Sequence, residues 1–193
     1  MNTKKRLIYI PLGGSGEIGM NMYAYGYGFP SAEEFILVDV GVTFPDMVSS
    51  PGVDLIMPDI SFIEQIKERL LGIFITHAHE DHIGALGHLL GKMGAPVFCR
   101  KFSGHIATSK LKKVDNFNYD LRIIDIYPKK TVLGPFEVSF LPISHSIPEA
   151  SSLIIDNPIG RLIHTGDFKL DESPVLGDRF DRHLLKKLKK PEV

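Results

Sequence analysis

The stretch His77-Ala78-His79-Glu80-Asp81-His82 places three imidazoles and two carboxylates within six residues. It follows directly on residues 72–76, an apolar run typical of a buried strand. Side chains alternate along an extended segment, so His77 and His79 point the same way. Asp81 and His82 can turn back from the loop that follows. We therefore expect this strand end to serve two metal ions.

Two further candidates lie downstream, each just past a predicted strand. His145 follows the strand ending at Leu141, and Asp167 follows residues 161–165. Nitrogen and carboxylate ligands without a thiolate suit zinc or manganese. A carboxylate can also bridge two ions at the spacing useful for hydrolysis. Asp167 is the residue we expect to form that bridge.

The remaining histidines carry less information. His88, His105 and His183 stand alone in the sequence, so we expect no chemistry from them. His164 lies three residues before Asp167, and two interpretations stay open: it orients a metal ligand from behind, or it simply packs.

Strands dominate the predicted secondary structure, with helices between them. Apolar, β-branched runs predict buried strands at residues 7–11, 35–40, 72–76 and 95–99. Phe136, Val138 and Phe140 alternate with polar residues as in a half-buried strand, and residues 153–156 and 161–165 flank the turn of a hairpin.

Helical spacing is found in three places. It links Ile63, Ile66 and Leu70, and it recurs over residues 86–93 before Gly94. Residues 184–190 form a lysine-rich amphipathic segment without the apolar density needed to close a core.

A second motif points to a different chemistry. Residues 14–19, Gly-Ser-Gly-Glu-Ile-Gly, match the dinucleotide fingerprint after a strand, and Asp39 lies near the distance at which that motif places its ribose-binding acid. The fingerprint requires a helix to begin at its glycines. Residues 20–29 instead alternate Tyr23, Tyr25 and Tyr27 with smaller residues, as a strand does. The glycines are therefore expected to form a tight hairpin loop that borders the site.

The ligand pattern resembles the metallo-β-lactamase superfamily: His77-x-His79-x-Asp81-His82, then His145, then Asp167. Finer features resemble the ribonuclease J family of beta-CASP ribonucleases over almost the whole chain; they lie at residues 12–21, 51–54, 76–85, 145–148 and 164–169. The resemblance implies an α/β fold, the αββα sandwich, with two zinc or manganese ions as cofactors. It also implies cleavage of RNA, as a 5′-3′ exonuclease, an endonuclease or both.

The resemblance also implies roles for individual residues. His77, His79 and His145 would hold one ion, Asp81 and His82 the other, with Asp167 between them. Asp81 and Asp167 are the expected catalytic residues, Asp81 as a proton-transfer group. Asp39 is expected to steady the strand-end loops from behind the ligands. Water activated by the two ions would attack the phosphodiester.

The resemblance also predicts one difference between this chain and members of the family. Family members continue into an inserted beta-CASP domain and then return to complete the first domain and supply its last histidine ligand. We expect residues 1–193 to be the N-terminal portion of that domain, with an incomplete sandwich and with 181–193 as a solvated or truncated boundary segment. Activity of this portion alone is an open question.

Composition sets broad bounds on the function. The chain has 193 residues with 44% hydrophobic content, enough for one domain with a real core. Its net charge of -1 gives no indication of nucleic-acid binding, so the evidence for an RNA partner must come from the residues of the predicted site. The single Cys99 excludes an internal disulfide and favours a cytoplasmic location. No run approaches the roughly 18 apolar residues of a membrane span.

Two alternatives to a ribonuclease remain. The same metal cluster serves hydrolysis of esters, thioesters or lactams in related families. The chain could also be a non-catalytic fragment that associates with itself through an uncovered sheet edge. The expected partners of the chain are RNA and a second copy of itself, as a homo-oligomer.

Overall fold

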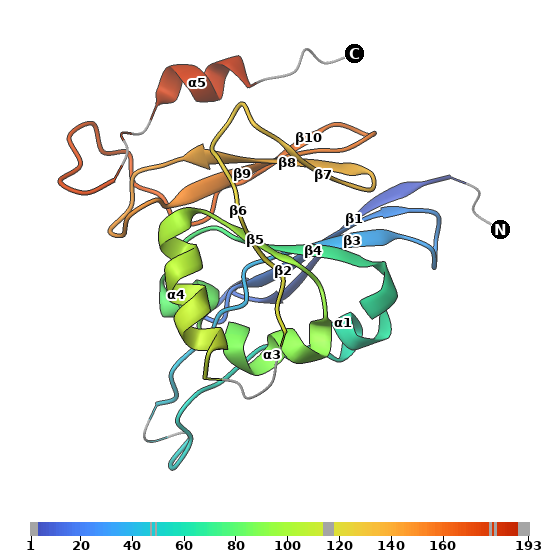
Figure 1. Cartoon of the computed structure of the whole chain (residues 1–193), viewed down its shortest axis with the longest axis vertical. Helices are drawn as coiled ribbons and strands as arrows, with labels where there is room; N and C mark the ends of the chain where they lie inside the picture. Colours follow the sequence, from blue (N-terminus) through green and yellow to red (C-terminus); the bar gives the residue numbers. More distant parts are fainter. Residues whose placement is uncertain are drawn as a thin grey trace.

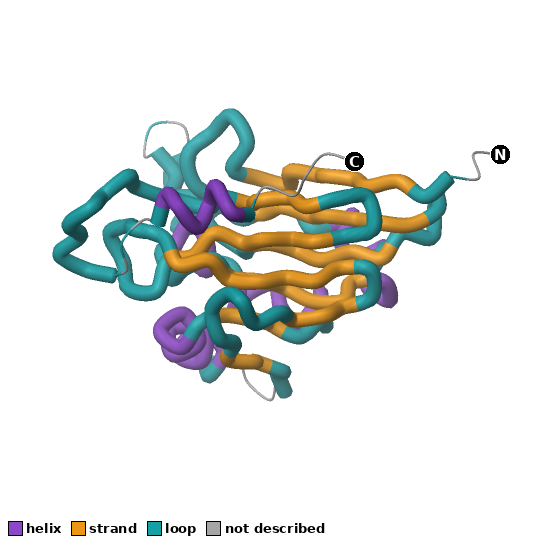
Figure 2. The backbone as a smooth tube through the Cα atoms, turned by 90° about the horizontal axis from the view of Figure 1, so that it is seen from above, coloured by secondary structure: helices purple, strands orange, loops and turns teal. Residues whose placement is uncertain are grey.

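Two β-sheets face each other in the computed structural model, which describes residues 4–46, 48, 50–113, 118–177, 179 and 181–188. Within these residues the first sheet has the strand order β1-β2-β3-β4-β5-β6, and the second has the order β10-β9-β8-β7. Helices cover the outer face of the first sheet, and one helix lies over the outer face of the second (Figures 1 and 2). This is the mixed α/β sandwich of metallo-β-lactamase proteins, as predicted.

The strands of the first sheet are β1 (Arg6–Gly13), β2 (Met22–Gly28), β3 (Glu34–Val38), β4 (Leu70–Ile75), β5 (Val97–Cys99) and β6 (Leu121–Ile123). Those of the second sheet are β7 (Thr131–Leu133), β8 (Phe136–Pro142), β9 (Ser151–Asp156) and β10 (Arg161–His164). The helices are α1 (Ser61–Gln65), the 3-10 helix η1 (Lys67–Arg69), α2 (Glu80–Ile83), α3 (Leu86–Met93), α4 (Lys101–Leu111) and α5 (Arg182–Lys187).

The apolar side chains form one cluster for each interface between layers. On β3, Leu37 packs toward the helices, whereas its neighbours Ile36 and Val38 pack between the two sheets. Phe74 of β4 and Phe140 of β8 meet in that middle layer. Side chains alternate across a strand, so the central strands of the first sheet are buried on both faces and read as continuous apolar runs.

Strand direction decides where the loops gather. β3, β4, β5 and β6 pair in parallel, so their carboxyl ends share one edge of the first sheet. The second sheet is antiparallel throughout. Ser151 at the start of β9 donates its backbone N–H to the carbonyl of Thr76, just past β4. The two sheets therefore meet at the edge where the histidine-rich stretch begins.

Most of the predicted elements are confirmed. The glycine loop at residues 14–19 joins β1 and β2, which pair antiparallel, so no helix begins at its glycines. β9 and β10 form the expected hairpin, and α3 ends at Gly94 in the left-handed conformation. One helix was predicted too long: α1 ends at Gln65, and Leu70 already belongs to β4. Leu70 still faces the same apolar cluster as Ile63, which explains the misleading spacing.

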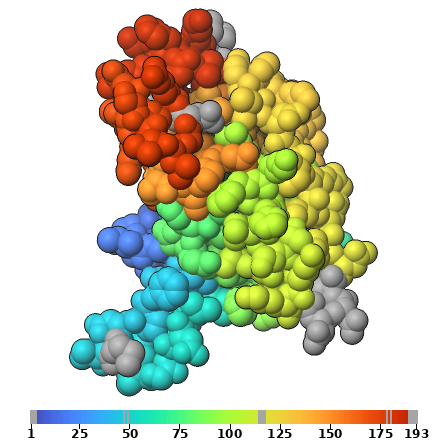
Figure 3. Space-filling model, turned by 60° about the vertical axis from the view of Figure 1, so that its left-hand side comes forward, coloured from blue at the N-terminus to red at the C-terminus, as the bar shows by residue number. Residues whose placement is uncertain are grey.

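The segment between β3 and α1 projects from the body of the molecule (cyan in Figure 3). Thr43 and Ile56 pair across its base through two backbone hydrogen bonds. Phe44 and Val48 are largely exposed on it. Its first residues, 39–43, lie against the body of the molecule and contact the histidine-rich stretch, residues 77–82.

Helix α5 packs against the second sheet, within the segment that was expected to be a solvated boundary. Leu188, just after the helix, is 2% exposed and lies against Leu141 and Ile154. The spacing of Leu184, Leu185 and Leu188 places all three on one helical face. The described part of 181–193 is thus partly buried, and the expectation of a solvated end does not hold for Leu188.

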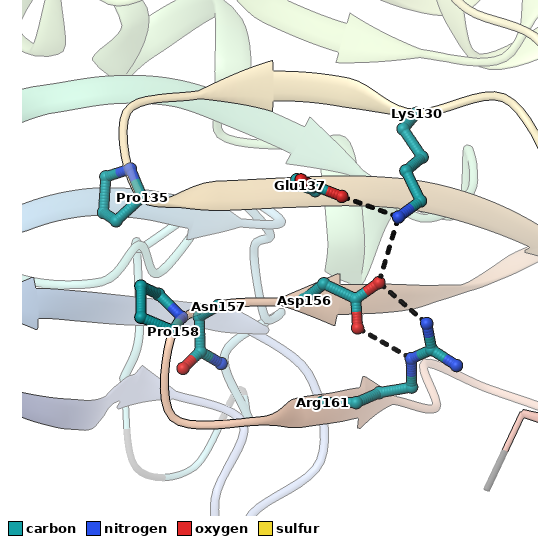
Figure 4. Close-up of a pocket in the computed structure, with 7 residues that line it drawn as sticks. All are labelled: Lys130, Pro135, Glu137, Asp156, Asn157, Pro158 and Arg161. Atoms are coloured by element: carbon teal, nitrogen blue, oxygen red, sulfur yellow. Dashed lines mark hydrogen bonds and ion pairs between the residues drawn. The ribbon is translucent and has the colours of Figure 1, made fainter. Parts of the chain in front are cut away.

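A charged cluster on the second sheet ties α5 to the hairpin (Figure 4). Arg161 makes a bidentate ion pair with Asp156 at 2.7 and 2.8 Å, and its third nitrogen donates to the carbonyl of Leu188. Lys130 bridges Asp156 and Glu137. These residues line a cavity of about 300 Å³. Glu137 is the second residue of β8 and Asp156 is the last of β9, so the cluster lies at the end of the sheet opposite the histidines.

In the part of the chain that the structure describes, no helix has both the length and the apolar character needed to cross a membrane.

Candidate metal centre

Three strand ends deliver the six predicted ligands to one place. His77 and His79 follow β4, and Asp81 and His82 lie in the short helix α2. His145 follows β8, and Asp167 follows β10. The backbone N–H groups of His82 and Ile83 donate to the carbonyl of His79, and this turn brings Asp81 and His82 back toward the strand end. Lys169 donates to the carbonyl of Ser144, which joins the two downstream loops.

Three imidazole nitrogens converge in what we call the first group, formed by His77, His79 and His145. His79 Nδ1 lies 3.1 Å from His77 Nε2 and 3.1 Å from His145 Nε2. Ligand nitrogens around a tetrahedral zinc ion, at about 2.1 Å from the metal, are about 3.4 Å apart. One ring nitrogen with a single hydrogen satisfies its two neighbours poorly, whereas a cation would satisfy all three lone pairs. The donor set therefore fits a divalent ion.

A second group able to hold an ion consists of His77, His82 and Asp167. Asp167 Oδ1 lies 3.4 Å from His82 Nε2, and its other oxygen lies 3.7 Å from His145 Nε2. Asp167 thus lies between the two groups. Asp81 Oδ2 is 3.5 Å from His82 Nε2, within reach of the same ion. His77 belongs to both groups, and its ring centroid lies 4.0 Å from that of His82.

Asp39 is fully buried behind the ligands and organises two of them. Its Oδ1 accepts the backbone N–H of Thr76, and its Oδ2 accepts both the Thr76 hydroxyl and Nδ1–H of His82. Since the Thr76 hydroxyl donates to Asp39, it accepts from Nδ1–H of His77 at 3.0 Å. Both histidines are thereby held in the tautomer that turns an unprotonated Nε2 toward the centre once His82 is neutral.

The ion-free electrostatics differ between the two sides of the centre. Burial first, and then the neighbouring His82, lowers the pKa of His77 to about 3. Burial would also lower the pKa of His82, but the carboxylates around it, Asp39 first, outweigh burial and raise the pKa to about 11. The hydrogen bond from His82 lowers the pKa of Asp167 to about 2. Without an ion, the carboxylates around His82 thus keep its imidazole protonated. This positive charge lies where the second group would hold an ion.

Metal binding at the second group is therefore expected to displace a proton from His82. The pKa is raised above the ordinary 6.5, so the protonated form persists through neutral pH, and zinc affinity should rise about tenfold per pH unit. The first group should depend less on pH, because the pKa values of His77 and His145 are lowered. Calorimetric titration in buffers of different ionisation enthalpy counts the released protons. Binding without proton release at neutral pH would contradict this.

The structure separates His164 from the ligands. Its Nδ1 lies 2.9 Å from the hydroxyl of Tyr25, and its ring contacts Tyr23. Tyr9, Tyr23, Tyr25 and His164 line a cavity of about 250 Å³ that reaches His82 and Asp167. His164 thus packs on the tyrosines of β2, and its support of a metal ligand stays a prediction. His88, His105 and His183 are exposed.

Sequence reasoning missed three residues that support the centre. The hydroxyl of Thr76 links Asp39 to His77 through two hydrogen bonds, as described above. Asn21 and Gly41 lie against Asp81: the backbone N–H of Asn21 donates to the Asp81 carbonyl at 2.9 Å, and a Cβ on Gly41 would be 1.7 Å from that same oxygen. The signal in the sequence was that Asn21 and Thr76 lie within residues 12–21 and 76–85, two of the stretches that resemble the ribonuclease J family.

Comparison with known proteins agrees with this geometry. The profile of the metallo-beta-lactamase superfamily matches residues 21–190. Among solved structures, the metallo-beta-lactamase fold protein YhfI from Bacillus subtilis superimposes with a TM-score of 0.52 at 19% identity, over 84% of this chain and 61% of that one. At this identity the likeness concerns the fold alone.

Closer sequence relatives carry the name ribonuclease J. The Sinorhizobium meliloti protein is 41% identical over 182 residues, which cover 94% of this chain and 32% of the relative. The Helicobacter pylori protein is 38% identical over 91% of this chain and 25% of its own length. The chain thus spans about a third or less of these curated relatives. Because the superfamily profile matches most of its residues, the chain belongs to the metallo-β-lactamase superfamily.

Proposed function

We propose that the chain is the metal-binding part of a metal-dependent ribonuclease that hydrolyses phosphodiester bonds in RNA. The observation that carries this proposal is the convergence of the first and second groups on one strand-end site, in a chain up to 41% identical to proteins named ribonuclease J. The proposed cofactors are two divalent ions, zinc or manganese. A cytoplasmic location and self-association stay predictions from the sequence.

The proposed ligand roles follow the geometry. His77, His79 and His145 would hold one ion, His82 and Asp81 would hold the other, and Asp167 would contact both. When bound, the two ions would polarise the phosphate and lower the pKa of water. Asp39 and Thr76 keep the histidines turned toward the centre. Asp81, with a side chain about one third exposed, is placed to pass a proton to solvent.

The test is cleavage of a single-stranded RNA labelled at its 5′ end, by the chain loaded with zinc or manganese. We expect labelled mononucleotide for an exonuclease and longer labelled fragments for an endonuclease. Asp167→Ala should abolish either product while Asp171→Ala, on the same loop, should not. Chromogenic lactam and thioester substrates run in parallel. Intact RNA together with hydrolysis of either of these substrates would overturn the proposal in favour of a different hydrolase.

A further inference from the structure

The side chain of Asn21 reaches the metal centre from the glycine loop. Its Nδ2 lies 3.1 Å from the Asp81 carbonyl oxygen, 3.3 Å from Asp81 Oδ2 and 3.1 Å from His82 Nε2. The hydroxyl of Tyr23 donates to Asn21 Oδ1 at 2.8 Å. Because Oδ1 accepts that hydrogen, the amide is fixed with its NH₂ toward Asp81 and His82.

The backbone around Asn21 is held as firmly as its side chain. Its N–H donates to the Asp81 carbonyl, and its C=O accepts from Gly41 at 3.0 Å. The preceding loop folds back tightly: a Cβ on Gly14, where φ is +79°, would be 2.4 Å from Asn21 Oδ1 and 2.4 Å from the Tyr23 hydroxyl oxygen. The first glycine of the sequence that resembles a dinucleotide fingerprint thus allows the close approach that brings Asn21 and Tyr23 together beside the centre.

Counting hydrogens shows which contacts the Asn21 amide satisfies. The amide has two hydrogens, and the carbonyl oxygen and the Oδ2 oxygen of Asp81 both lie within reach as acceptors. Nε2 of His82 accepts in neither state, because it carries a hydrogen in the ion-free protein and an ion would take its lone pair. The two amide hydrogens therefore match the two oxygens of Asp81 one to one and hold its carboxylate beside His82 Nε2. Carboxylates that bind metals are commonly oriented by such a hydrogen bond.

We infer that Asn21, fixed by Tyr23, is a positioning residue for the ion held by Asp81, His82 and Asp167. This inference rests on the proposed metal-dependent function and adds to it. It assigns the glycine loop a role in metal binding in place of the nucleotide binding its sequence suggests. The ion held by His77, His79 and His145 should not depend on Asn21.

The experiment titrates the ion-free chain with zinc, and separately with manganese, by calorimetry. Asn21→Ala is expected to lower the affinity for one of the two ions by about tenfold or more and to leave the affinity for the other unchanged. Tyr23→Phe, which removes only a hydroxyl, should lower the affinity for the same ion by a smaller factor. Tyr27→Phe removes a hydroxyl from the same strand and serves as the control. Adding His145→Ala to each variant removes the first group and identifies the affected ion.

Thermal unfolding in chelator separates positioning from a purely structural role. If Asn21 only stabilises the loop, its replacement lowers the unfolding temperature of the ion-free chain and leaves both zinc affinities unchanged. That result would show that the inference is wrong. Equal weakening of both ions would also overturn it, as general loosening of the site. A wild-type chain that binds no ion overturns the proposed function together with the inference. Two ions in the wild type, unaffected in both variants, overturn the inference alone.

Discussion

Alanine in place of His77 is expected to weaken metal binding on both sides of the centre. His77 would hold the ion of the first group and also belongs to the second group, so its loss removes one donor from each. Beside the carboxylate of Asp167, the first group then keeps only His79 and His145, and we expect the metal content to fall from about two ions per chain to one or fewer. Since bound ions would supply several kcal/mol of transition-state stabilisation, the proposed RNA cleavage should fall by at least about 10³-fold. Elemental analysis and the cleavage assay measure the two effects.

Two comparisons sharpen this expectation. His145→Ala removes a ligand from the first group only, so it should retain more metal than His77→Ala. His88→Ala removes an exposed imidazole from α3 and should change neither metal content nor cleavage. Because His77 is buried, unfolding in chelator must show that His77→Ala still folds. A folded His77→Ala variant that keeps two ions would rule out the shared position of His77.

The ligands were accessible to sequence reasoning because four of the six are neighbours in the chain. The alternation of a strand and the turn after it fix how His77, His79 and His82 can point, before any long-range contact is known. His145 and Asp167 could be placed only because each follows a predicted strand. The rejection of the dinucleotide fingerprint likewise depended on a local pattern, the alternating tyrosines of β2.

The supporting residues were inaccessible because their roles depend on contacts between distant segments. Asp39 was assigned through resemblance, and its hydrogen bonds to Thr76 and His82 span 37 and 43 residues. Asn21 meets Asp81 across 60 residues. The overlong helix at residues 63–70 has a related cause, because a helix and the strand after it can bury side chains in one cluster. Spacing alone cannot tell these cases apart.

Gly41→Ala is expected to be the most destabilising small substitution near the centre. The added Cβ would lie 1.7 Å from the carbonyl oxygen of Asp81 and 2.9 Å from the backbone nitrogen of Asn21. Both are backbone atoms, so no side-chain rotation relieves the clash. Residues 40–42 are also tied to α2, with Val40 donating to the His82 carbonyl and Val42 to that of Glu80. Separating these segments should cost about 3 kcal/mol of unfolding free energy.

Gly160→Ala is the matched control, because a Cβ there meets no atom within 4 Å. Its unfolding free energy should stay within about 1 kcal/mol of the wild type. Urea unfolding in chelator measures both variants without any contribution from bound ions. Zinc titration of Gly41→Ala should then show weakened binding on the Asp81 side, since α2 must move to admit the methyl group. If the two variants unfold at the same urea concentration, residues 39–42 do not lie against α2, and the packing that positions Asp81 and His82 is wrong.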